Sequence, residues 1–377
     1  MELRVSGIHR FPLKEKVWID RLLMPLSPSH PTMNRRFLLS LLAAMPLGLS
    51  FAAEDYLTFE PKGESKGKHV VLIAGDEEYR SEEGLPQLAK ILSERHGFKT
   101  TVLFSVDQDG FIDANNQASL TNPAALDSAD AIIMLIRFRH WPDEAMKHFH
   151  DAVQRGVPIV GLRTATHAFN MDKTSAYNAW AWNNAQGGFG RMVLGETWVS
   201  HWGKHRAEAT KGILEPSAKN NAVLRGVADL FGTTDVYEAS PPADSVILVR
   251  GQVVAGMDPG SAPANYRKKN KSGTEQGVNE PMMPIAWTRE VKNEAGKTNK
   301  ILCTTMGAAS DLTNEGLRRL VVNGVYWGLG LEVPASADVS LVGEFKPRMY
   351  GTKDGDDLKD PHRFNAFKRG VKPADLK

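Results

Sequence analysis

The 377-residue chain has a single cysteine, Cys303, and this scarcity excludes two classes of structure. One cysteine forms no internal disulfide, and it cannot supply a cysteine-rich metal cluster. Cys303 lies in the apolar run ILCTT, which favours a small, buried packing residue over a nucleophile. A disulfide-stabilised scaffold and a cysteine-rich zinc module are therefore excluded by composition.

The chain also lacks a large excess of charge of either sign. Its formal net charge is +2, and residues 1–52 hold seven Lys and Arg against three Asp and Glu, so the rest of the chain has a net charge of −2. This balance argues against nucleic acid and against an anionic membrane as partners. With 42% hydrophobic and 24% charged residues, the composition is that of a soluble globular protein with a substantial core.

An apolar run near the N-terminus is too short to cross a bilayer comfortably. The segment MNRRFLLSLLAAMPLGLSFAAED has two arginines, an apolar stretch of roughly 15 residues and then small residues. We predict a signal peptide over residues 33–52, cleaved after Ala52, with export to the periplasm or the extracellular space and no stable membrane span thereafter. A membrane anchor is the alternative. Residues 1–32 are interpreted as an upstream extension of the reading frame, and 53–67 as a linker.

Strand and helix signals alternate over residues 68–162 at the pace of a parallel sheet. The pattern predicts strands at 68–74, 99–104, 131–136 and 157–162, with helices at 85–96, from 122 and at 142–155. This order implies right-handed crossovers and an α/β fold whose mostly parallel sheet has helices on both faces. Strands at 205–214, 245–254 and 282–289 read as antiparallel additions, followed by a core strand at 301–306 and a helix at 313–329.

Two later segments carry weaker structural signals. The run 260–279 is rich in Gly, Lys and Asn, and we expect it to be mobile. Residues 332–377 form a C-terminal extension, which from Val339 onwards is polar and turn-rich. We expect this tail to lie along the surface or to be partly disordered.

Polar residues follow three of the predicted parallel strands, where the carboxyl ends of such strands meet at one sheet edge. In chain order these residues are Asp76, Glu77 and Glu78 after the first strand, Arg137 and Arg139 after the third, and Arg163, Thr164, Thr166 and His167 after the central strand. Because ligands bind at this edge in open α/β sheets, the sequence predicts one site there.

The carboxylates after the first strand could act as general acid and base, hydrogen-bond sugar hydroxyls or hold a divalent cation. Alternatively, Asp76 caps a turn and Glu77 faces solvent. Arg137 and Arg139 alternate, so only one of them can point into the crevice. There a guanidinium would suit a carboxylate, a phosphate or a developing oxyanion, and a buried salt bridge is the alternative. His167 could transfer protons near neutral pH.

His201 and His205 are four residues apart, a spacing that on a helix would make them a possible metal pair. Gly203 and the neighbouring aromatics favour a loop or strand, and a metal would need a third ligand such as His167 or a carboxylate. We therefore interpret both histidines as substrate contacts, with a solvent-facing polar edge as the alternative, and assign no metal ligand. The loop 170–195 is either a lid or a surface insertion, and its Trp182 could stack on a sugar face.

We expect catalytic roles for His167, Arg163, Glu78 and Asp76, and ligand-binding roles for Glu77, Arg137, Arg139, Thr164, Thr166, Trp182, His201 and His205.

Several sequence blocks resemble the ThuA-like (trehalose utilisation) family of the class I glutamine amidotransferase-like superfamily. They span residues 68–331 and read VVLIAG, GVPIVGLRTATHAF, HWGKH, VLRGVADLF with DVYEA after it, PIAWTR, and KILCTTMGAASDLTNEGLRRLVVNGVYWGLG. The resemblance implies a flavodoxin-like, class I glutamine amidotransferase-like fold and a sugar-like ligand. VGEFKP in the tail resembles the extensions of secreted members.

The chain departs from the family pattern at two positions. Where the superfamily presents a nucleophilic cysteine, this chain has Arg163 or Thr164, which excludes glutaminase chemistry by that route. Many ThuA-like chains also carry a histidine directly after the glycine of the TT-x-G block, whereas here Gly307 is followed by Ala308. A role for that histidine does not carry over.

The sequence thus predicts a secreted ThuA-like protein that acts on, or binds, a carbohydrate or sugar derivative by acid–base chemistry, such as hydrolysis or isomerisation. A non-catalytic ligand-binding or scaffold protein of the same fold is the alternative. No cofactor is assigned, and a homo-oligomer is compatible with the sequence.

Overall fold

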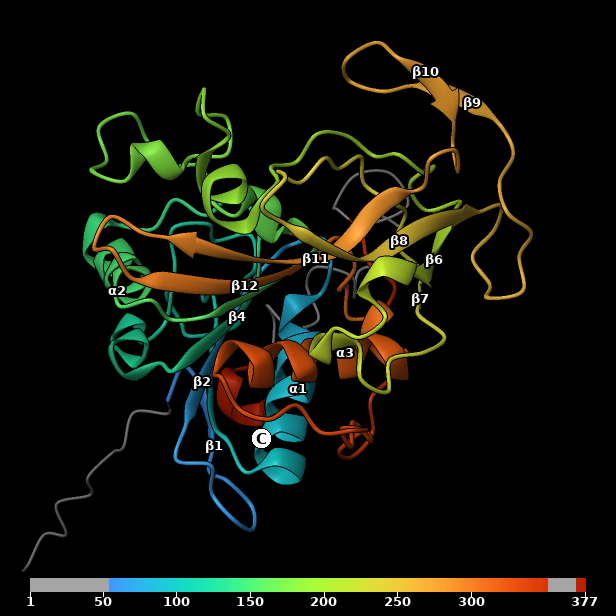
Figure 1. The fold of residues 1–377 in the computed structure, drawn as a ribbon. Coiled ribbons are helices and arrows are strands. Elements are labelled where there is room, and N and C mark those ends of the chain that lie inside the picture. The colour runs from blue at the N-terminus through green and yellow to red at the C-terminus, as the bar shows by residue number, and fades with distance from the viewer. Residues whose placement is uncertain (1–53, 352–370) are drawn as a thin grey trace, which may run out of the picture. The chain divides into compact units, whose positions relative to one another are not determined.

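The computed structural model of the chain describes residues 54–351 and 371–377 (Figure 1). The predicted upstream extension at 1–32 and the signal peptide at 33–52 lie outside the described residues. Within the described part, no helix combines the length and the apolar character that crossing a bilayer requires.

A ten-stranded sheet carries the fold, with strand order β1-β3-β2-β4-β5-β12-β11-β8-β6-β7. Its strands are β1 (Leu57–Phe59), β2 (His69–Gly75), β3 (Lys99–Leu103), β4 (Ala131–Ile136), β5 (Ile159–Leu162), β6 (Ala209–Leu214), β7 (Phe231–Gly232), β8 (Val246–Val254), β11 (Met283–Lys292) and β12 (Thr298–Thr304). A separate hairpin pairs β9 (Arg267–Lys269) with β10 (Glu275–Gly277). The α-helices are α1 (Ser81–His96), α2 (Asp143–Gln154) and α3 (Glu315–Gly328).

Five neighbouring strands, β3, β2, β4, β5 and β12, are parallel. The strand β4 reads AIIMLI and is buried at every position, because a parallel strand covered on both faces has no side that meets water. The remaining strands pair antiparallel, with β1 on one edge and β11, β8, β6 and β7 on the other. This arrangement confirms the predicted α/β sheet with added antiparallel strands.

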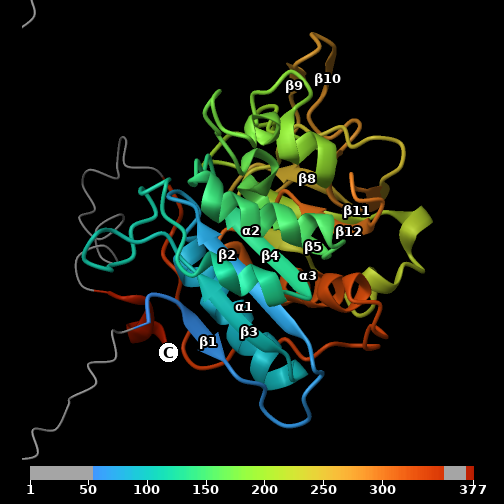
Figure 2. The same cartoon turned by 90° about the vertical axis from the view of Figure 1, so that its left-hand side faces the viewer.

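Helices cover both faces of the sheet and bury two separate hydrophobic cores (Figures 1 and 2). Leucines and valines of α1 and α3 pack on one face, with Leu72, Leu135 and Leu302. On the other face, Met146 and Phe149 of α2 pack on the alternate residues of the same strands. Residues of one strand alternate between the two cores, as the period of two requires.

Two predicted boundaries need correction. The helix expected from residue 85 begins at Ser81 and carries Pro86 inside it, because Arg80 adopts a left-handed φ of 57° and starts the helix directly after the polar turn. The strand expected from residue 205 begins at Ala209. Residues 204–208 form turns instead, in which the backbone N–H groups of Ala207 and Glu208 donate to the carbonyl of Lys204.

The two segments with weak signals are anchored. Within the excursion expected to be mobile, Lys268 of β9 donates from Nζ to the backbone carbonyls of His201 and Trp202, at 3.0 and 2.8 Å. The C-terminal extension is not wholly on the surface, since Val339 and Tyr350 are buried. The Tyr350 hydroxyl donates to the carbonyl of Thr233 at 3.0 Å, and the Tyr350 ring centroid lies 5.1 Å from that of Tyr79, so the tail reaches the turn that follows β2.

Candidate functional site

Asp76 directly follows β2 and shapes the polar turn there. It is fully buried, and its Oδ1 accepts the backbone N–H groups of Glu78 and Tyr79 at 2.7 and 2.6 Å. Its Oδ2 accepts the hydroxyl of Thr164. Asp76 therefore caps the turn after β2, which is the alternative that the sequence left open. The hydroxyl of Thr164 is used in its hydrogen bond to Asp76.

Glu77 is paired with both arginines that follow β4. Its Oε2 accepts from Arg139 at 3.0 Å, and its Oε1 lies 3.5 Å from Nε of Arg137. Burial, reinforced by the nearby charge of Asp76, raises the pKa of Glu77 to about 7. Arg139 is fully buried and also donates to the carbonyls of Arg137 and Ala114, so it points away from the crevice, whereas Arg137 is partly exposed.

Glu78 lies between a guanidinium and an imidazole. It forms an ion pair with Arg137, and its Oε1 lies 3.2 Å from Nε2 of His205. Burial pushes the pKa of Glu78 upward, but the contacts with His205 and Arg137 outweigh it and hold that pKa below its usual value. Glu78 is therefore ionised and joins the β2 turn to the loop that carries the histidine pair.

Arg163 occupies the sharp turn directly after β5. Its φ of 43° lies in the left-handed region that side chains other than glycine rarely adopt, a strain typical of functional turns. The guanidinium is fully buried, stacks 3.7 Å from the ring centroid of Tyr237 and donates to the carbonyls of Asp235 and Thr305. Its NH2 is 2.9 Å from Oδ1 of Asp235, so Arg163 holds that carboxylate in place.

Asp235, between β7 and β8, gathers the histidine pair. Its Oδ2 lies 2.8 Å from Nδ1 of His201, and its Oδ1 lies 3.0 Å from Nδ1 of His205. Burial alone would raise the pKa of Asp235, but Arg163 and the two histidines lower it far below its usual value. The histidine side chains are 37% and 28% exposed, so solvent reaches both rings.

Contacts with Asp235 and Glu78 also set the pKa of His205. Burial lowers the pKa of its ring, yet the hydrogen bonds to Asp235 and Glu78 raise it further, and the net pKa lies above its usual value. Two tilted rings lie beside it: the centroid of the His205 ring is 4.6 Å from that of His201 and 5.5 Å from that of Tyr350. The C-terminal extension thus forms part of the wall around His205.

His167 has the opposite environment. It is almost fully buried, and its Nδ1 lies 3.1 Å from the hydroxyl of Thr166. Its ring centroid is 5.1 Å from that of Phe138 and 5.9 Å from that of Trp198. Burial, followed by the positive charges of Arg137 and Arg163, holds the pKa of His167 well below its usual value, so the ring is neutral at pH 7.

Aromatic rings form the rim beside His167. Trp182 lies 5.4 Å from Phe138 and 6.4 Å from Trp198 between ring centroids, and Trp198 is also 5.9 Å from His201. The loop 170–195 therefore supplies a partly exposed indole close to the histidines. Trp182 is the one tryptophan of the loop that contacts this group, since Trp180 packs against Phe149 in the core.

The structure therefore brings the predicted residues of all three strand ends together with His201, His205 and Trp182. Sequence reasoning missed Asp235, Tyr79, Tyr237, Trp198 and Tyr350. Asp235 and Tyr237 lie in the block DVYEA, one of the family landmarks, so the sequence did carry a signal for them. Tyr350 comes from the polar tail, where no sequence signal marked it.

Metal-ligating side chains gather at one point of the part that the structure describes. The group consists of His201, His205 and Asp235, whose ligand atoms all lie within 4.8 Å of one another. Imidazole nitrogen with carboxylate oxygen is a donor set that suits divalent transition metals.

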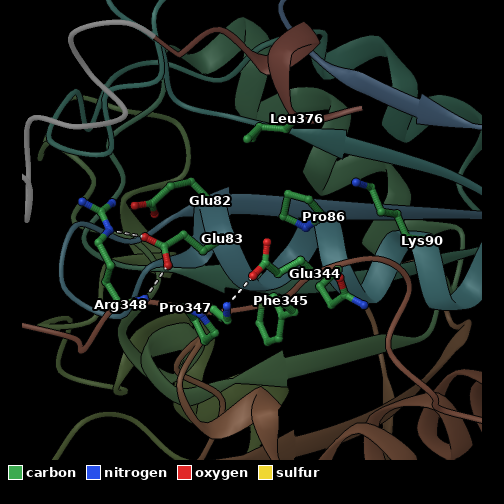
Figure 3. Close-up of a pocket in the computed structure, with 11 residues that line it drawn as sticks. Glu82, Glu83, Pro86, Lys90, Glu344, Phe345, Pro347, Arg348 and Leu376 are labelled. Carbon is green, nitrogen blue, oxygen red and sulfur yellow. Dashed lines mark hydrogen bonds and ion pairs between the residues drawn. The ribbon is translucent and has the colours of Figure 1, made fainter.

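A cavity of about 330 Å³ lies elsewhere, between α1 and the C-terminal extension (Figure 3). Glu83, on its wall, accepts from the backbone and the side chain of Arg348, at 2.8 and 2.7 Å. These contacts fasten the extension to α1. The cavity thus lies where the C-terminal extension packs on α1. We place the candidate site instead at the strand tips, where histidines, carboxylates and an arginine converge.

The chain is similar to a known family and to several solved structures. A sequence model of the ThuA family, described as trehalose utilisation, matches residues 69–328. Among solved structures, the chain is similar to a ThuA-like protein from Parabacteroides merdae, with 16% identity, a TM-score of 0.44 and coverage of 76% of this chain and 95% of that one. A ThuA-like protein from Bacteroides uniformis gives 17% identity, a TM-score of 0.44 and coverage of 71% and 94%.

The glutaminase domain of Trypanosoma brucei CTPS gives 11% identity, a TM-score of 0.35 and coverage of 72% and 98%. No curated protein matches the chain. The family match confirms the resemblance to the ThuA family drawn from the sequence, and the sheet order confirms the predicted α/β fold with added antiparallel strands. Because the match covers more than half of its length, the chain belongs to the ThuA (trehalose utilisation) family.

Proposed function

We propose that this ThuA-family protein is exported, binds a carbohydrate or sugar derivative at the tips of β2, β4 and β5, and acts on it by acid–base chemistry without a cysteine nucleophile. The observation that carries the proposal is a row of three histidines. His167 and His201 both lie against Trp198, and His201 lies in a tilted contact with His205, which contacts the ionised Glu78.

His167 is the candidate general base. Its ring is neutral at pH 7, because burial and the nearby arginines depress its pKa, and a neutral imidazole can accept a proton from a hydroxyl or from water. Arg137, which is partly exposed beside Glu78, offers donors to an oxygen on which negative charge develops.

Covalent catalysis has little support in the described residues. The Thr164 hydroxyl is buried and donates to Asp76, and Arg163 occupies the turn where the superfamily presents its cysteine. Cys303 is buried in β12, and burial raises the pKa of its thiol well above the usual value. A thiolate nucleophile is therefore not formed at neutral pH.

The rim supports a sugar-like ligand. Trp182 and Trp198 present partly exposed aromatic surface beside polar groups, and small-molecule sites combine such surface with a few placed donors and acceptors. The family description, trehalose utilisation, points to the same class of ligand.

A second candidate is a binding protein without turnover. The observation that favours it is that Glu77, Glu78 and Asp235 already have partners within the protein. A ligand would then meet a polar but internally neutralised surface, which recognises shape and hydroxyl groups and transfers no proton.

A screen of the purified protein against trehalose, other sugars and oxidised sugar derivatives tests the proposal. Calorimetry measures binding and chromatography measures turnover. We expect His167→Gln to reduce turnover by about 100-fold or more while binding persists. The matched control is His148→Gln, whose ring pairs with Asp127 on the surface. Turnover that is equal in the two variants contradicts the catalytic proposal, and binding without turnover by the wild type favours the second candidate.

Two further measurements address the ligand and export. Trp182→Ala is expected to weaken sugar binding at least tenfold, about 1.4 kcal/mol. Trp327→Ala, which removes a ring beside Lys300, is the control. For export, the mature protein recovered from the periplasm or medium should begin at Ala53. An unprocessed N-terminus in the cytoplasm contradicts that part of the proposal.

A further inference from the structure

We infer that His201, His205 and Asp235 bind one divalent transition-metal ion of the zinc class. The inference deepens the proposed function by naming the cofactor of the same site, and it takes from that proposal only the location.

The spacing of the three side chains fits a shared ion. Nδ1 of His201 and Nδ1 of His205 lie 2.8 and 3.0 Å from the two oxygens of Asp235. Two ligand atoms bound to one ion at about 2.0–2.1 Å lie roughly 2.9–3.4 Å apart. Each histidine nitrogen therefore lies from the Asp235 carboxylate at a distance typical of neighbouring ligands, and all three ligand atoms lie within 4.8 Å of one another.

The surroundings of His205 also fit a metal ligand. Carboxylate oxygens face both of its ring nitrogens, Asp235 at Nδ1 and Glu78 at Nε2. With an ion at Nδ1, the Nδ1 lone pair binds the metal and the Nε2–H donates to Glu78. This arrangement is the usual one for a metal-bound histidine with a carboxylate behind it.

Arg163 completes the support of the carboxylate ligand. Its NH2 donates to Oδ1 of Asp235, and its NH1 donates to the backbone carbonyl of the same residue. Both side chains are fully buried. Asp235 is thus held rigidly with Oδ2 directed at His201, as a ligand that serves a preformed site should be.

The ligand set and its exposure define the class of ion. Two imidazoles and one carboxylate suit Zn²⁺ and Co²⁺, whereas Mg²⁺ and Ca²⁺ prefer oxygen donors throughout. Three protein ligands leave a coordination position open, and both histidine side chains are partly exposed, so solvent reaches the ligand group. A metal there would supply a polarised water or a Lewis acid to the ligand crevice.

The test uses protein stripped with a chelator and then dialysed. Calorimetric titration with Zn²⁺ is expected to give one ion per chain, and Co²⁺ is expected to produce a visible absorption band of a low-symmetry site. Mg²⁺ should give neither signal. The inference is overturned if the stripped wild type binds Zn²⁺ no more tightly than the His201→Asn variant does. The absence of a Co²⁺ band overturns it as well.

Variants localise the ion. His201→Asn and His205→Asn should each weaken Zn²⁺ binding by about 100-fold or more, and Glu78→Gln by about 10- to 100-fold through the lost partner of Nε2. His148→Asn, at the surface pair with Asp127, should bind as the wild type does. Circular dichroism of each variant establishes that it is folded, and equal binding by His201→Asn and His148→Asn contradicts the assignment.

Sugar binding measured on stripped and zinc-loaded protein separates this inference from the proposed function. Zinc binding with no sugar binding supports the metal site and removes the proposed ligand. Sugar binding with no zinc binding supports the ligand and removes the metal site.

Discussion

Arg163 and Asp235 form an ion pair at 2.9 Å in which neither side chain is exposed. Arg163 follows the parallel strand β5, and Asp235 lies in the antiparallel part, between β7 and β8. The pair therefore joins the two parts of the sheet at the place where the histidines gather.

Removing one partner of this pair should be costly. Arg163→Met leaves the Asp235 carboxylate buried without its partner, and we expect the free energy of unfolding to fall by about 3–5 kcal/mol. Urea denaturation monitored by circular dichroism measures the change. The double variant Arg163→Met/Asp235→Leu should lose less unfolding free energy than the sum of the losses in the two single variants. The exposed pair Lys62–Glu94 is the control, since Lys62→Met should cost about 1 kcal/mol or less.

A second prediction concerns Glu82 of α1 and pH. Burial, with the charge of Glu83 added, raises the pKa of Glu82 to about 7 despite the nearby Arg80. The folded protein therefore holds this proton more tightly than the unfolded chain. The resulting stability is present below pH 4.5, the ordinary pKa, and is lost as the pH rises to about 7.

Glu82→Gln removes that ionisation. As the pH rises from 4.5 to 8, the unfolding free energy of the wild type should fall by about 3 kcal/mol relative to that of the variant, which is the equivalent of the shift in pKa. Denaturation at a series of pH values measures it. Glu94→Gln on the same helix is the matched variant, and identical pH profiles for the two variants would count against the prediction.

The C-terminal extension is predicted to stabilise the fold through Tyr350. Tyr350→Ala should lower the free energy of unfolding by about 3–5 kcal/mol, as for other buried aromatics. Tyr350→Phe should cost about 1 kcal/mol, because it keeps the buried ring and loses the hydrogen bond to Thr233. Met349→Ala, at an exposed neighbour, is the control. Thermal unfolding checks all three, and equal melting temperatures for the Ala variants would show that the tail is not anchored there.

Cys303 should be inert in the native protein. It is fully buried in β12, and burial raises the pKa of its thiol, so neither access nor ionisation favours reaction. We expect no labelling by a thiol reagent until guanidinium unfolds the chain, when one thiol per chain reacts. Fast labelling of folded protein would contradict the buried placement.

The parallel strands could be predicted from the sequence because burial on both faces leaves a continuous apolar signal, as in β4. The start of α1 could not be placed, since Pro86 is typical of a first helical turn yet lies inside the helix. Its true start depends on the left-handed backbone of Arg80, which no local pattern marks.

The candidate site was predictable to the extent that it follows strand ends. Glu78, Arg137 and His167 could be grouped because parallel strands bring their carboxyl ends together. Asp235 and Tyr350 could not, because they arrive from the antiparallel part and the tail, through pairings between segments distant in the sequence. Such long-range contacts depend on the whole packed sheet and leave no periodicity to read.

The strand β12 has a position with a consequence for inactivation by heat. It pairs parallel with β5 on one side and antiparallel with β11 on the other, so it is the seam between the two parts. A partial opening along that seam would pull the histidine pair away from its anchoring arginine while α1 and α2 stay packed on the parallel strands. Loss of the proposed ligand binding on warming should therefore precede the loss of helical signal, and a stored sample can look folded after the candidate site has come apart.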